Sequence, residues 1–397
     1  MTFSPDLLER AVAPSLELSW ERDVVALRRD FHAHPELGFH ETRSAGIVAA
    51  RLRALGYEVR EGVGVTGVVA TLQLGRPGPH TLVRADMDAL PIEEDTPWQW
   101  RSQNPGAMHA CGHDCHMAIG LSVARLLSQS RDELAGRVTF MFQPAEEGLG
   151  GAARMIADGL LDPRPDYALA LHVWSDIEAG TIGLSSGPVM ACADEFRARI
   201  VGRGGHGALP HQTVDAIVVA AQVVTALQTV VARNLKPLQA GVVTVGTLRA
   251  GNAFNVIPGV AHLEGTLRAF DPQARALIER RCREIIETLP PAFGARGEWE
   301  FFPGFPATVN DEGVTRHLER AFATLEGVRL EPFEPTLGAE DMSLVLQQIP
   351  GCYFFVGGRS ESSGAIWPHH HPSFNIDERA LLVGTRALVA AVRALAQ

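Results

Sequence analysis

The sequence predicts a mixed α/β protein with a smaller α+β domain inserted into it. At 397 residues the chain exceeds the size at which a single hydrophobic core usually keeps growing, so two domains are expected. In the first and last parts of the chain, short apolar strands alternate with amphipathic helices, which is typical of a mixed central sheet flanked by helices. From about residue 190 the order becomes strand, helix, two strands, helix and strand, the ferredoxin-like arrangement. We therefore expect one domain from residues 1–188 and 304–397, and an inserted domain from residues 189–303.

Hydrophobic periodicity predicts the individual elements in order. In the first domain we expect helices at residues 20–32, 42–55 and 114–128, and strands at residues 57–60, 66–74, 80–85, 137–143 and 166–172. In the insert we expect strands at residues 194–201, 241–248, 260–270 and 297–302, and helices at residues 215–233 and 272–289. After Pro306 we expect helices at residues 311–325, 339–348 and 377–395, with a strand at residues 352–356.

Composition limits the class of function. Hydrophobic residues make up 46% of the chain and charged residues 20%, as in an ordinary globular protein. The net charge of −11 and the lack of a Lys/Arg run argue against a nucleic-acid partner. The nearest approach to a membrane span, residues 216–224, is short and contains Gln222, and the N-terminus lacks a signal-peptide pattern. Because the five cysteines are odd in number and scattered, we expect a cytoplasmic protein with reduced thiols that acts on a small molecule, with no membrane partner.

Residues 108–117 carry the strongest chemical signal in the chain. They hold three histidines, two cysteines and an aspartate, although the whole chain has only 15 His and 5 Cys. Cys111 and His113 are separated by Gly112, so on a turn both side chains can point at one centre. Thiolate sulfur and imidazole nitrogen suit zinc. The alternative, a helix start with Asp114 as N-cap, explains one polar residue of the six, so we interpret the stretch as a metal site.

Other polar residues follow predicted strands, and the carboxyl ends of strands are where ligands gather in open α/β sheets. Asp86 and Asp88 follow the strand at 80–85, Glu146 and Glu147 follow the strand at 137–143, and His172 ends the strand at 166–172. Each has an ordinary alternative. The aspartates could cap a turn, adjacent glutamates are common on surfaces, and a lone apolar-flanked histidine is often bonded to backbone in the core.

Two familiar motifs lack the context that their function needs. Residues 62–67 match GxGxxG, but a strand rather than a helix follows, so a hairpin is the better interpretation. Residues 183–187 match GxSxG, but Pro188 and a β-like segment follow where a nucleophile elbow needs a helix. His32 and His34 have no carboxylate-and-thiol cluster beside them, so we expect them to support a site or lie on the surface rather than bind metal.

The separate signals combine into one hypothesis. Cys111, His113, Glu147, His172 and one of the histidines 369–371 all fall at the carboxyl end of a predicted strand or in a loop that could reach there. Five ligands are too many for one tetrahedral zinc and suit two metal ions that share a bridge. Glu146 is then left over as a general base beside the metals.

An ordered set of segments resembles the M20 family of dinuclear metallopeptidases and amidohydrolases, in particular the branch of hippurate hydrolase, the indoleacetyl-amino-acid hydrolases and the N-acyl-amino-acid carboxypeptidases. The matching segments are residues 28–41, 84–92, 108–116, 142–148, 171–174, 202–211, 255–258, 338–341 and 368–374. The resemblance implies a zinc-exopeptidase-like catalytic domain and two divalent metal ions per subunit, zinc or alternatively manganese, cobalt or nickel. It implies hydrolysis of the amide bond of N-acyl amino acids or of short peptides with a free carboxylate.

The resemblance also implies a role for each residue. Cys111 would bridge the metals, His113 and His172 would complete one, and Glu147 and His370 the other. His370 is preferred to His369 and His371 because the family's histidine stands two residues before the proline, here Pro372. Glu146 would be the general base, and Asp88 would remain as the acid behind the ligands, since other branches carry a histidine where this chain has Asp86.

The inserted domain resembles the family's dimerisation lid. This implies a homodimer or dimer-based oligomer in which His206 polarises the scissile carbonyl, reaching the partner subunit's site. Asn255 and Arg268 would hold the substrate carboxylate or the developing oxyanion, because an oxyanion needs donors aimed where its charge develops. The acyl group stays open, with residues 92–107 and their Trp98 and Trp100 as a candidate pocket wall. A non-catalytic binding protein on the same scaffold, or a purely structural zinc, is the alternative.

Overall fold

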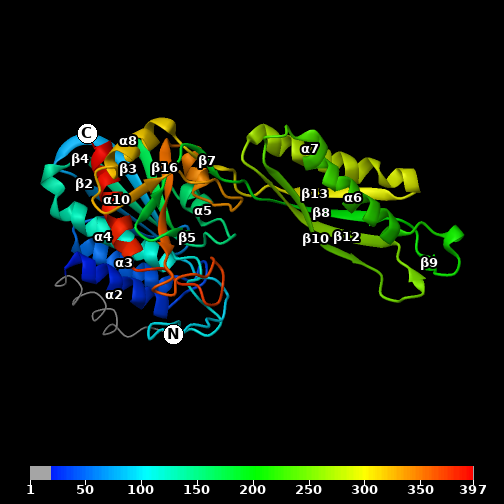
Figure 1. The fold of residues 1–397 in the computed structure, drawn as a ribbon, viewed down its shortest axis with the longest axis horizontal. Helices are drawn as coiled ribbons and strands as arrows, with labels where there is room; N and C mark the ends of the chain where they lie inside the picture. Colours follow the sequence, from blue (N-terminus) through cyan, green and yellow to red (C-terminus); the bar gives the residue numbers. More distant parts are fainter. Residues whose placement is uncertain (1–18, 397) are drawn as a thin grey trace. The chain divides into compact units, whose positions relative to one another are not determined.

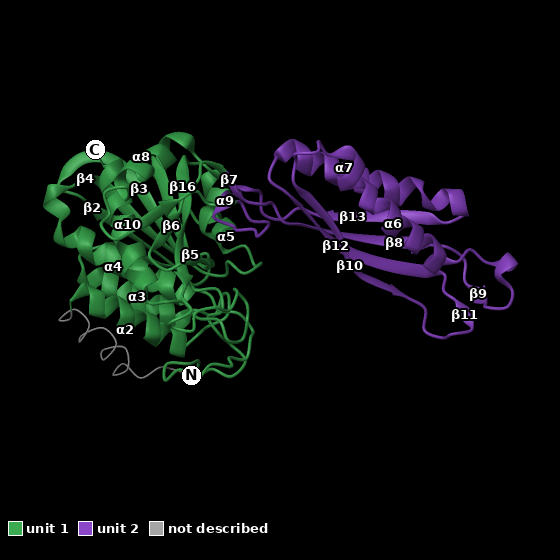
Figure 2. Ribbon diagram, viewed as in Figure 1, with its two compact units in different colours: residues 1–187, 309–334, 344–397 green, residues 188–308, 335–343 purple. Residues whose placement is uncertain are grey.

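The computed structural model describes residues 19–396, which divide into two compact units, each with its own hydrophobic core (Figures 1 and 2). Unit 1 holds the chain up to Gly187 together with Val309–Glu334 and Leu344 onward, and unit 2 holds Pro188–Thr308 and Pro335–Ser343. Residues 335–343, expected in the segment 304–397 of the first domain, group with unit 2. There the backbone N–H of Ala191 bonds to the carbonyls of Thr336 and Gly338.

Unit 1 is built on an eight-stranded sheet with the strand order β1-β2-β4-β3-β5-β16-β6-β15. The strands are β1 (Glu58–Val63), β2 (Gly67–Gln73), β3 (Arg76–Asp86), β4 (Ala135–Gln143), β5 (Tyr167–Glu178), β6 (Thr181–Gly183), β15 (Arg329–Glu331) and β16 (Gly351–Arg359). The central strands β4, β3, β5 and β16 are parallel, whereas β1–β2, β2–β4 and β16–β6 are antiparallel pairs. The predicted mixed sheet is therefore confirmed, and residues 62–67 lie in the β1–β2 hairpin rather than at a helix start.

Seven helices of the described chain flank or follow this sheet (Figure 1). They are α2 (Trp20–Ala33), α3 (Thr42–Ala54), α4 (His113–Gln129), α5 (Gly151–Ala157), α8 (Glu312–Phe322), α9 (Ser343–Leu346) and α10 (Arg379–Leu395), with a 3₁₀ turn at Arg131–Glu133. The helix expected at residues 339–348 is wrong in length. Before Ser343 the chain is irregular, and the Glu340 side chain accepts the Met342 backbone N–H at 3.0 Å.

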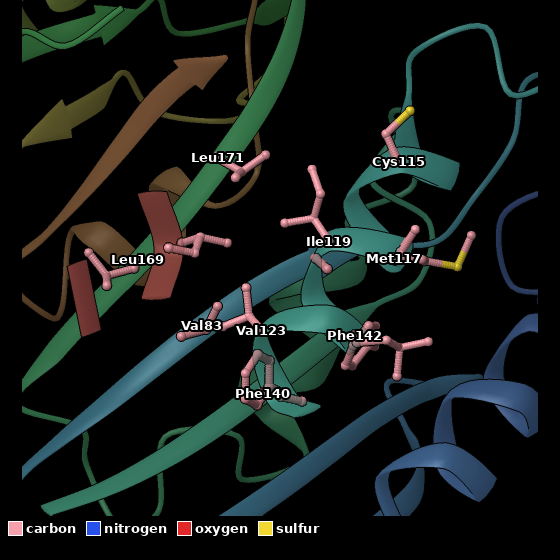
Figure 3. Packing of buried hydrophobic residues seen from close by; sticks show 14 of the residues in the cluster. Val83, Cys115, Met117, Ile119, Val123, Phe140, Phe142, Leu169 and Leu171 are labelled. Carbon is pink, nitrogen blue, oxygen red and sulfur yellow. The ribbon is translucent and has the colours of Figure 1, made fainter. Parts of the chain in front are cut away.

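Helix α4 is the core helix of unit 1. Thirteen of its residues are buried, and it packs against α2, α3, α10 and strand β3. Figure 3 shows Met117, Ile119 and Val123 of this helix among Phe140 and Phe142 of β4. A helix that is apolar on most sides is stable only inside a core. The N-terminus of α4, which carries His113, is therefore held in rigid surroundings.

Strand β5 is longer than expected, because it continues from His172 to Glu178. The sequence analysis placed His172 at the end of its strand, but in the structure His172 lies in the interior of β5. Pairing between β3 and β5 nevertheless stops at Arg84 and Ala170, so β5 beyond that point pairs with β16 alone. His172 therefore lies two residues beyond the last β3–β5 pair, close to the carboxyl end of β3.

Unit 2 has the predicted ferredoxin-like order, with β8 (Asp194–Val201), α6 (Ala216–Asn234), β10 (Gly241–Ala250), β12 (Val260–Ala269), α7 (Pro272–Thr288) and β13 (Arg296–Phe302). The four strands form an antiparallel sheet in the order β10-β12-β8-β13. Asp215 and Asp271 cap α6 and α7 through their carboxylates, which fixes both helix starts. A small ribbon pairs β9 (Gly205–His206) with β11 (Val256–Ile257), and 3₁₀ turns lie at Pro210–Gln212 and Pro290–Phe293.

Where the chain passes between the units it forms the short strands β7 (Gly187–Met190) and β14 (Thr308–Asn310). Because β7 rather than a helix follows residues 183–187, the GxSxG match is not a nucleophile elbow.

Helix α6 is longer than the apolar run seen in the sequence, and by length and composition it would be able to cross a membrane. The core helix of a globular unit passes the same test. Val219, Val223 and Leu227 of α6 are buried in the core of unit 2, whereas Ile217 and Val218 near its start are exposed.

Candidate metal centre

The turn before α4 brings Cys111 and His113 to the same side of the backbone. Gly112 is the N-cap of α4 and has a left-handed φ of 93°. A Cβ added at Gly112 would lie 2.4 Å from Cγ2 of Val173, so only glycine fits there. Asp114 does not cap α4, as the alternative interpretation of this stretch requires, because its carboxylate is turned away from the helix end to Arg28 and His32.

The two buried histidines of this centre are oriented by hydrogen bonds at Nδ1. His113 Nδ1 donates to the carbonyl of Asp88 at 2.9 Å and lies 3.2 Å from the Asp88 carboxylate. His172 Nδ1 donates to the carbonyl of Val173 at 2.6 Å. In this tautomer the Nε2 lone pair of each ring is available to a cation. His172 Nε2 lies 3.5 Å from Cys111 Sγ, and His113 Nε2 is buried with no hydrogen-bond partner.

Glu146 and Glu147 lie in the turn that follows β4. The backbone N–H of Glu147 donates to the Asp88 carboxylate at 3.0 Å, so Asp88 touches two separate segments of the centre. One carboxylate oxygen of Glu147 is buried without a hydrogen bond and lies 3.3 Å from His370 Nε2. Glu146 is 8% exposed, and its carboxylate lies within 4.8 Å of ligand atoms of His113 and Glu147.

Of the three consecutive histidines, only His370 reaches this cluster. Its backbone has a φ of 65°, and its N–H donates to the Ala110 carbonyl at 2.8 Å. His369 Nε2 accepts the backbone N–H of Ser175 at 3.1 Å, so that nitrogen is already used. His371 stacks on Trp367. The geometry therefore favours the same histidine as the position of Pro372 in the sequence.

The ligand atoms form two groups that share the Cys111 sulfur. Cys111, His113 and His172 form one, and Cys111, Glu147 and His370 form the other, with all ligand atoms in each group within 4.8 Å of one another. Sulfur, imidazole nitrogen and carboxylate oxygen are a suitable donor set for divalent transition metals. His113 Nε2 and the Glu147 oxygen belong to these groups and make no hydrogen bond, so the residues present fit a pair of metal ions.

The electrostatics of the cluster also favour a cation. Burial alone would lower the pKa of His113, but the Asp86 and Asp88 carboxylates outweigh burial and raise this pKa to about 10. Burial together with Glu147 and Glu146 raises the pKa of the Cys111 thiol well above its usual range. The carboxylates that contribute to both shifts give the buried site negative charge, which a bound divalent ion would offset.

Several supporting residues were missed by the sequence reasoning. His116 Nδ1 donates to Asp86 at 2.6 Å and its Nε2 accepts the Val173 N–H at 3.0 Å, so it holds β3 and β5 together rather than binding metal. Asp86 also bonds to Arg84. The only signal available was the density of histidines around His113, which does not say which of them are ligands.

A buried ionic network lies behind the Cys111–His113 turn, in which His32 has the supporting place that the sequence analysis allowed for it, whereas Arg28 and Glu94 had not been singled out. Asp114 accepts from Arg28 Nε and His32 Nδ1, both at 2.8 Å, and His32 Nε2 lies 3.2 Å from Glu94. Burial and Arg28 oppose protonation of His32, but Asp114 and Glu94 raise its pKa. The Glu94 carboxylate accepts the Ser102 N–H, which ties residues 92–107 to this network. The His34 ring lies away from this network, since Nδ1 donates to the Asp30 carbonyl at 2.8 Å and lies 3.5 Å from the Asp30 carboxylate.

The three predicted substrate-binding residues of unit 2 lie in two places. His206 and Asn255 are exposed neighbours, since the Gly207 N–H donates to the Asn255 carbonyl at 2.8 Å. Arg268 is half-buried at the other end of β12, with Nη1 buried and unpartnered. The structure of unit 2 therefore groups His206 with Asn255 and separates Arg268 from both.

Two ligand groups share the Cys111 sulfur, and they lie in a unit with a mixed sheet whose chain is interrupted by a ferredoxin-like insert. These features define a candidate dinuclear metal protein. A sequence profile of "Peptidase family M20/M25/M40" matches residues 82–394, and the chain belongs to this family.

Two named relatives illustrate its range. The chain is 39% identical over 386 residues to thermostable carboxypeptidase 1 of Saccharolobus solfataricus, covering 96% of this chain and 97% of that one. It is 45% identical over 297 residues to the N-acyl-L-amino acid amidohydrolase of Geobacillus stearothermophilus, covering 74% and 80%. Among solved structures, YXEP of Bacillus subtilis, described as a dinuclear metal binding peptidase from the M20 family, superposes with a TM-score of 0.85 at 34% identity, covering 95% and 98%.

Proposed function

We propose that this protein is a metal-dependent amidohydrolase that cleaves the amide bond of N-acyl amino acids, or of short peptides with a free carboxylate. The observation that carries the proposal is the pair of ligand groups sharing Cys111, with the Glu146 carboxylate next to them. The named activities of the two relatives above, a carboxypeptidase and an N-acyl-L-amino acid amidohydrolase, support this substrate class.

The proposed cofactor is a pair of divalent ions, for which zinc suits the thiolate and manganese, cobalt and nickel are alternatives. Cys111 would bridge them, His113 and His172 would complete one site, and Glu147 and His370 the other. When bound, such ions acidify a shared water and polarise the scissile carbonyl.

Glu146 is the proposed general base. Its carboxylate lies beside the ligand cluster, so it can take a proton from the attacking water and later deliver it to the departing amine nitrogen. Asp88 supports this arrangement from behind, because its two oxygens contact the His113 ring and the Glu147 amide. His206, Asn255 and Arg268 are proposed to bind the substrate carbonyl and carboxylate, with His206 acting on the partner subunit of a cytoplasmic homodimer.

The test is amine release from a panel of N-acyl amino acids, including hippurate and acetylated amino acids, with several divalent metals. Glu146→Gln should lower kcat by about 10²–10⁴-fold while bound metal stays unchanged, since the variant keeps the shape but cannot accept the proton. Glu58→Gln, at an exposed position of β1, is the matched control and should be as active as the unaltered enzyme. Near-normal turnover of Glu146→Gln with full metal content would refute the proposed base.

Chelation separates the enzyme from its two alternatives. The enzyme predicts a folded, inactive protein after metal removal, with activity restored by adding metal back. A purely structural zinc predicts unfolding on chelation. A binding protein without catalysis predicts tight retention of N-acyl amino acids with no amine release.

A further inference from the structure

Ala145 has an unusual backbone conformation directly before Glu146 and Glu147. Its φ is +52°, in the left-handed region that L side chains rarely adopt, and it is fully buried. Such strain persists only where the surroundings impose it, and it is often found at functional sites. The direction in which the chain leaves Ala145 sets where the next two carboxylates point.

Glu41 is the side chain that contacts this strained peptide. It is fully buried, and its Oε1 accepts the Ala145 backbone N–H at 2.8 Å, across a separation of 104 residues. Its other oxygen accepts the hydroxyl of Thr66. Burial raises the pKa of Glu41, and the Thr66 hydrogen bond partly offsets that rise.

The use of Glu41 is unexpected from its place in the sequence. It is the N-cap residue of α3, where a carboxylate normally accepts the first backbone N–H groups of its own helix, yet it makes no side-chain cap. Glu36 takes that role instead, because its two oxygens accept the N–H groups of Arg43 and Ser44, each at 2.8 Å. Glu41 is thereby directed away from the helix and toward Ala145.

The turn is fixed at its other end as well. The Glu147 N–H donates to Asp88 at 3.0 Å, and the Ala145 carbonyl accepts the Gly151 N–H at 3.1 Å. Gly38 packs against Ala145 so closely that a Cβ at Gly38 would lie 3.1 Å from the Ala145 Cβ. Glu41 at the entry and Asp88 at the exit therefore bracket the Glu146–Glu147 pair.

We propose that Glu41 is a positioning residue that holds Ala145 in its left-handed conformation, so that Glu146 and Glu147 face the metal ligands. The Glu41 carboxylate bonds to the Ala145 backbone and the Thr66 hydroxyl, so it would act on the carboxylates through the backbone. The roles of Glu146 and Glu147 rest on the function proposed above, whereas the contact from Glu41 to Ala145 does not.

The test is a double-mutant cycle of Glu41→Ala and Ala145→Gly. Zn²⁺ affinity of the chelator-treated protein is measured by calorimetry without substrate, and kcat and KM are measured separately on an N-acyl amino acid. Glu41→Ala should weaken Zn²⁺ binding and lower kcat, each about 10–100-fold, the range seen when groups that orient metal ligands are removed, with little change in KM. Ala145→Gly should stay near the unaltered protein, because glycine adopts a positive φ without strain.

The double variant tests whether Glu41 acts through the backbone conformation of Ala145. If Glu41 acts by imposing the Ala145 conformation, adding Ala145→Gly to Glu41→Ala should recover part of the lost Zn²⁺ affinity and kcat. Unchanged Zn²⁺ affinity and kcat in Glu41→Ala, or no recovery in the double variant, would overturn the proposal. Should Glu41→Ala fail to fold, Glu41→Gln keeps the shape and one acceptor oxygen and should show a smaller loss in the same direction.

Glu36→Gln is the matched control at the same helix terminus. It should lower the melting temperature by weakening the α3 cap while leaving Zn²⁺ affinity and kcat unchanged. If Glu36→Gln lowers Zn²⁺ affinity as much as Glu41→Ala does, general destabilisation is the cause and the proposal fails. If no N-acyl amino acid is hydrolysed at all, the proposed function fails, while the Zn²⁺ affinities still test Glu41.

Discussion

The candidate site residues of the two units differ in how firmly each unit holds them. In unit 1, the single Asp88 carboxylate contacts both the His113 ring and the Glu147 amide, and the Val173 carbonyl orients the His172 ring. In unit 2, His206 and Asn255 are exposed and held only by local backbone contacts. Unit 1 therefore carries a preorganised candidate centre, whereas unit 2 presents His206 and Asn255 at exposed positions.

The histidines show the same difference. Six are buried, namely His32, His80, His109, His113, His116 and His172, and all belong to unit 1. The described histidines of unit 2, His206, His211 and His262, are exposed. Changes in unit 1 should therefore affect metal binding and stability, and changes at the unit 2 residues should affect turnover alone.

The largest effect is expected from the thiolate shared by both ligand groups. Cys111→Ala should reduce hydrolysis to background and lower the metal content below two ions per chain, because each group loses its common donor. Cys282→Ala, a buried cysteine in α7 of unit 2, is the control and should keep full metal content with a small loss of stability from its cavity. Metal analysis after gel filtration checks both, and two tightly bound ions in Cys111→Ala would contradict the shared-ligand arrangement.

The next largest effect is expected in unit 2. His206→Ala should lower kcat by about 10²–10³-fold, the loss usual for one donor to a developing oxyanion, with no change in melting temperature or metal content. The side chain is exposed and its ring accepts only the neighbouring Ala208 N–H, so little stability depends on it. A clear drop in the Zn²⁺ affinity of His206→Ala would contradict the assignment of metal binding to unit 1 alone.

A smaller effect is expected behind the ligands in unit 1. Asp88→Asn should weaken metal binding about 10–100-fold, because the carboxamide cannot accept from both the His113 ring and the Glu147 amide as the carboxylate does. Titration of the chelator-treated protein with Zn²⁺ measures this directly. Unchanged affinity would mean that the His113 contact to the Asp88 carbonyl suffices to orient the ring.

The smallest effect concerns pH and stability. Burial and Arg137 lower the pKa of His80 to about 4, whereas in the unfolded chain it is about 6.5. Between these values the unfolded state binds more protons, so the His80 contribution to the free energy of unfolding is present above pH 6.5 and is lost as the pH falls toward 4. The stability difference between the unaltered protein and His80→Gln should therefore shrink from pH 7 to pH 5 in denaturant titrations. Parallel pH curves for His80→Gln and the unaltered protein would contradict the assignment.

Much of this arrangement could be predicted from the sequence because its signals are local. Strand and helix periods predicted the mixed sheet and the insert, and the density of His, Cys and Glu after strands pointed to the candidate ligands. Glu41 and Arg28 could not be found that way, since their partners Ala145 and Asp114 lie 104 and 86 residues away and no periodic pattern links them. The N-cap of α4 could not be predicted either, because left-handed Gly112 occupies that position without any capping side chain.

The strand order has a consequence for how the chain is made. Strand β16 lies between β5 and β6, yet the ribosome synthesises all of unit 2 after β6 and before β16. A nascent chain with Cys111, His113, Glu147 and His172 already outside the exit tunnel still lacks the strand that covers β5 and the histidine that follows it at position 370. Translation therefore delivers His370, the last of the proposed ligands, only after unit 2 and β16 have been made, so the full centre can assemble only after that point.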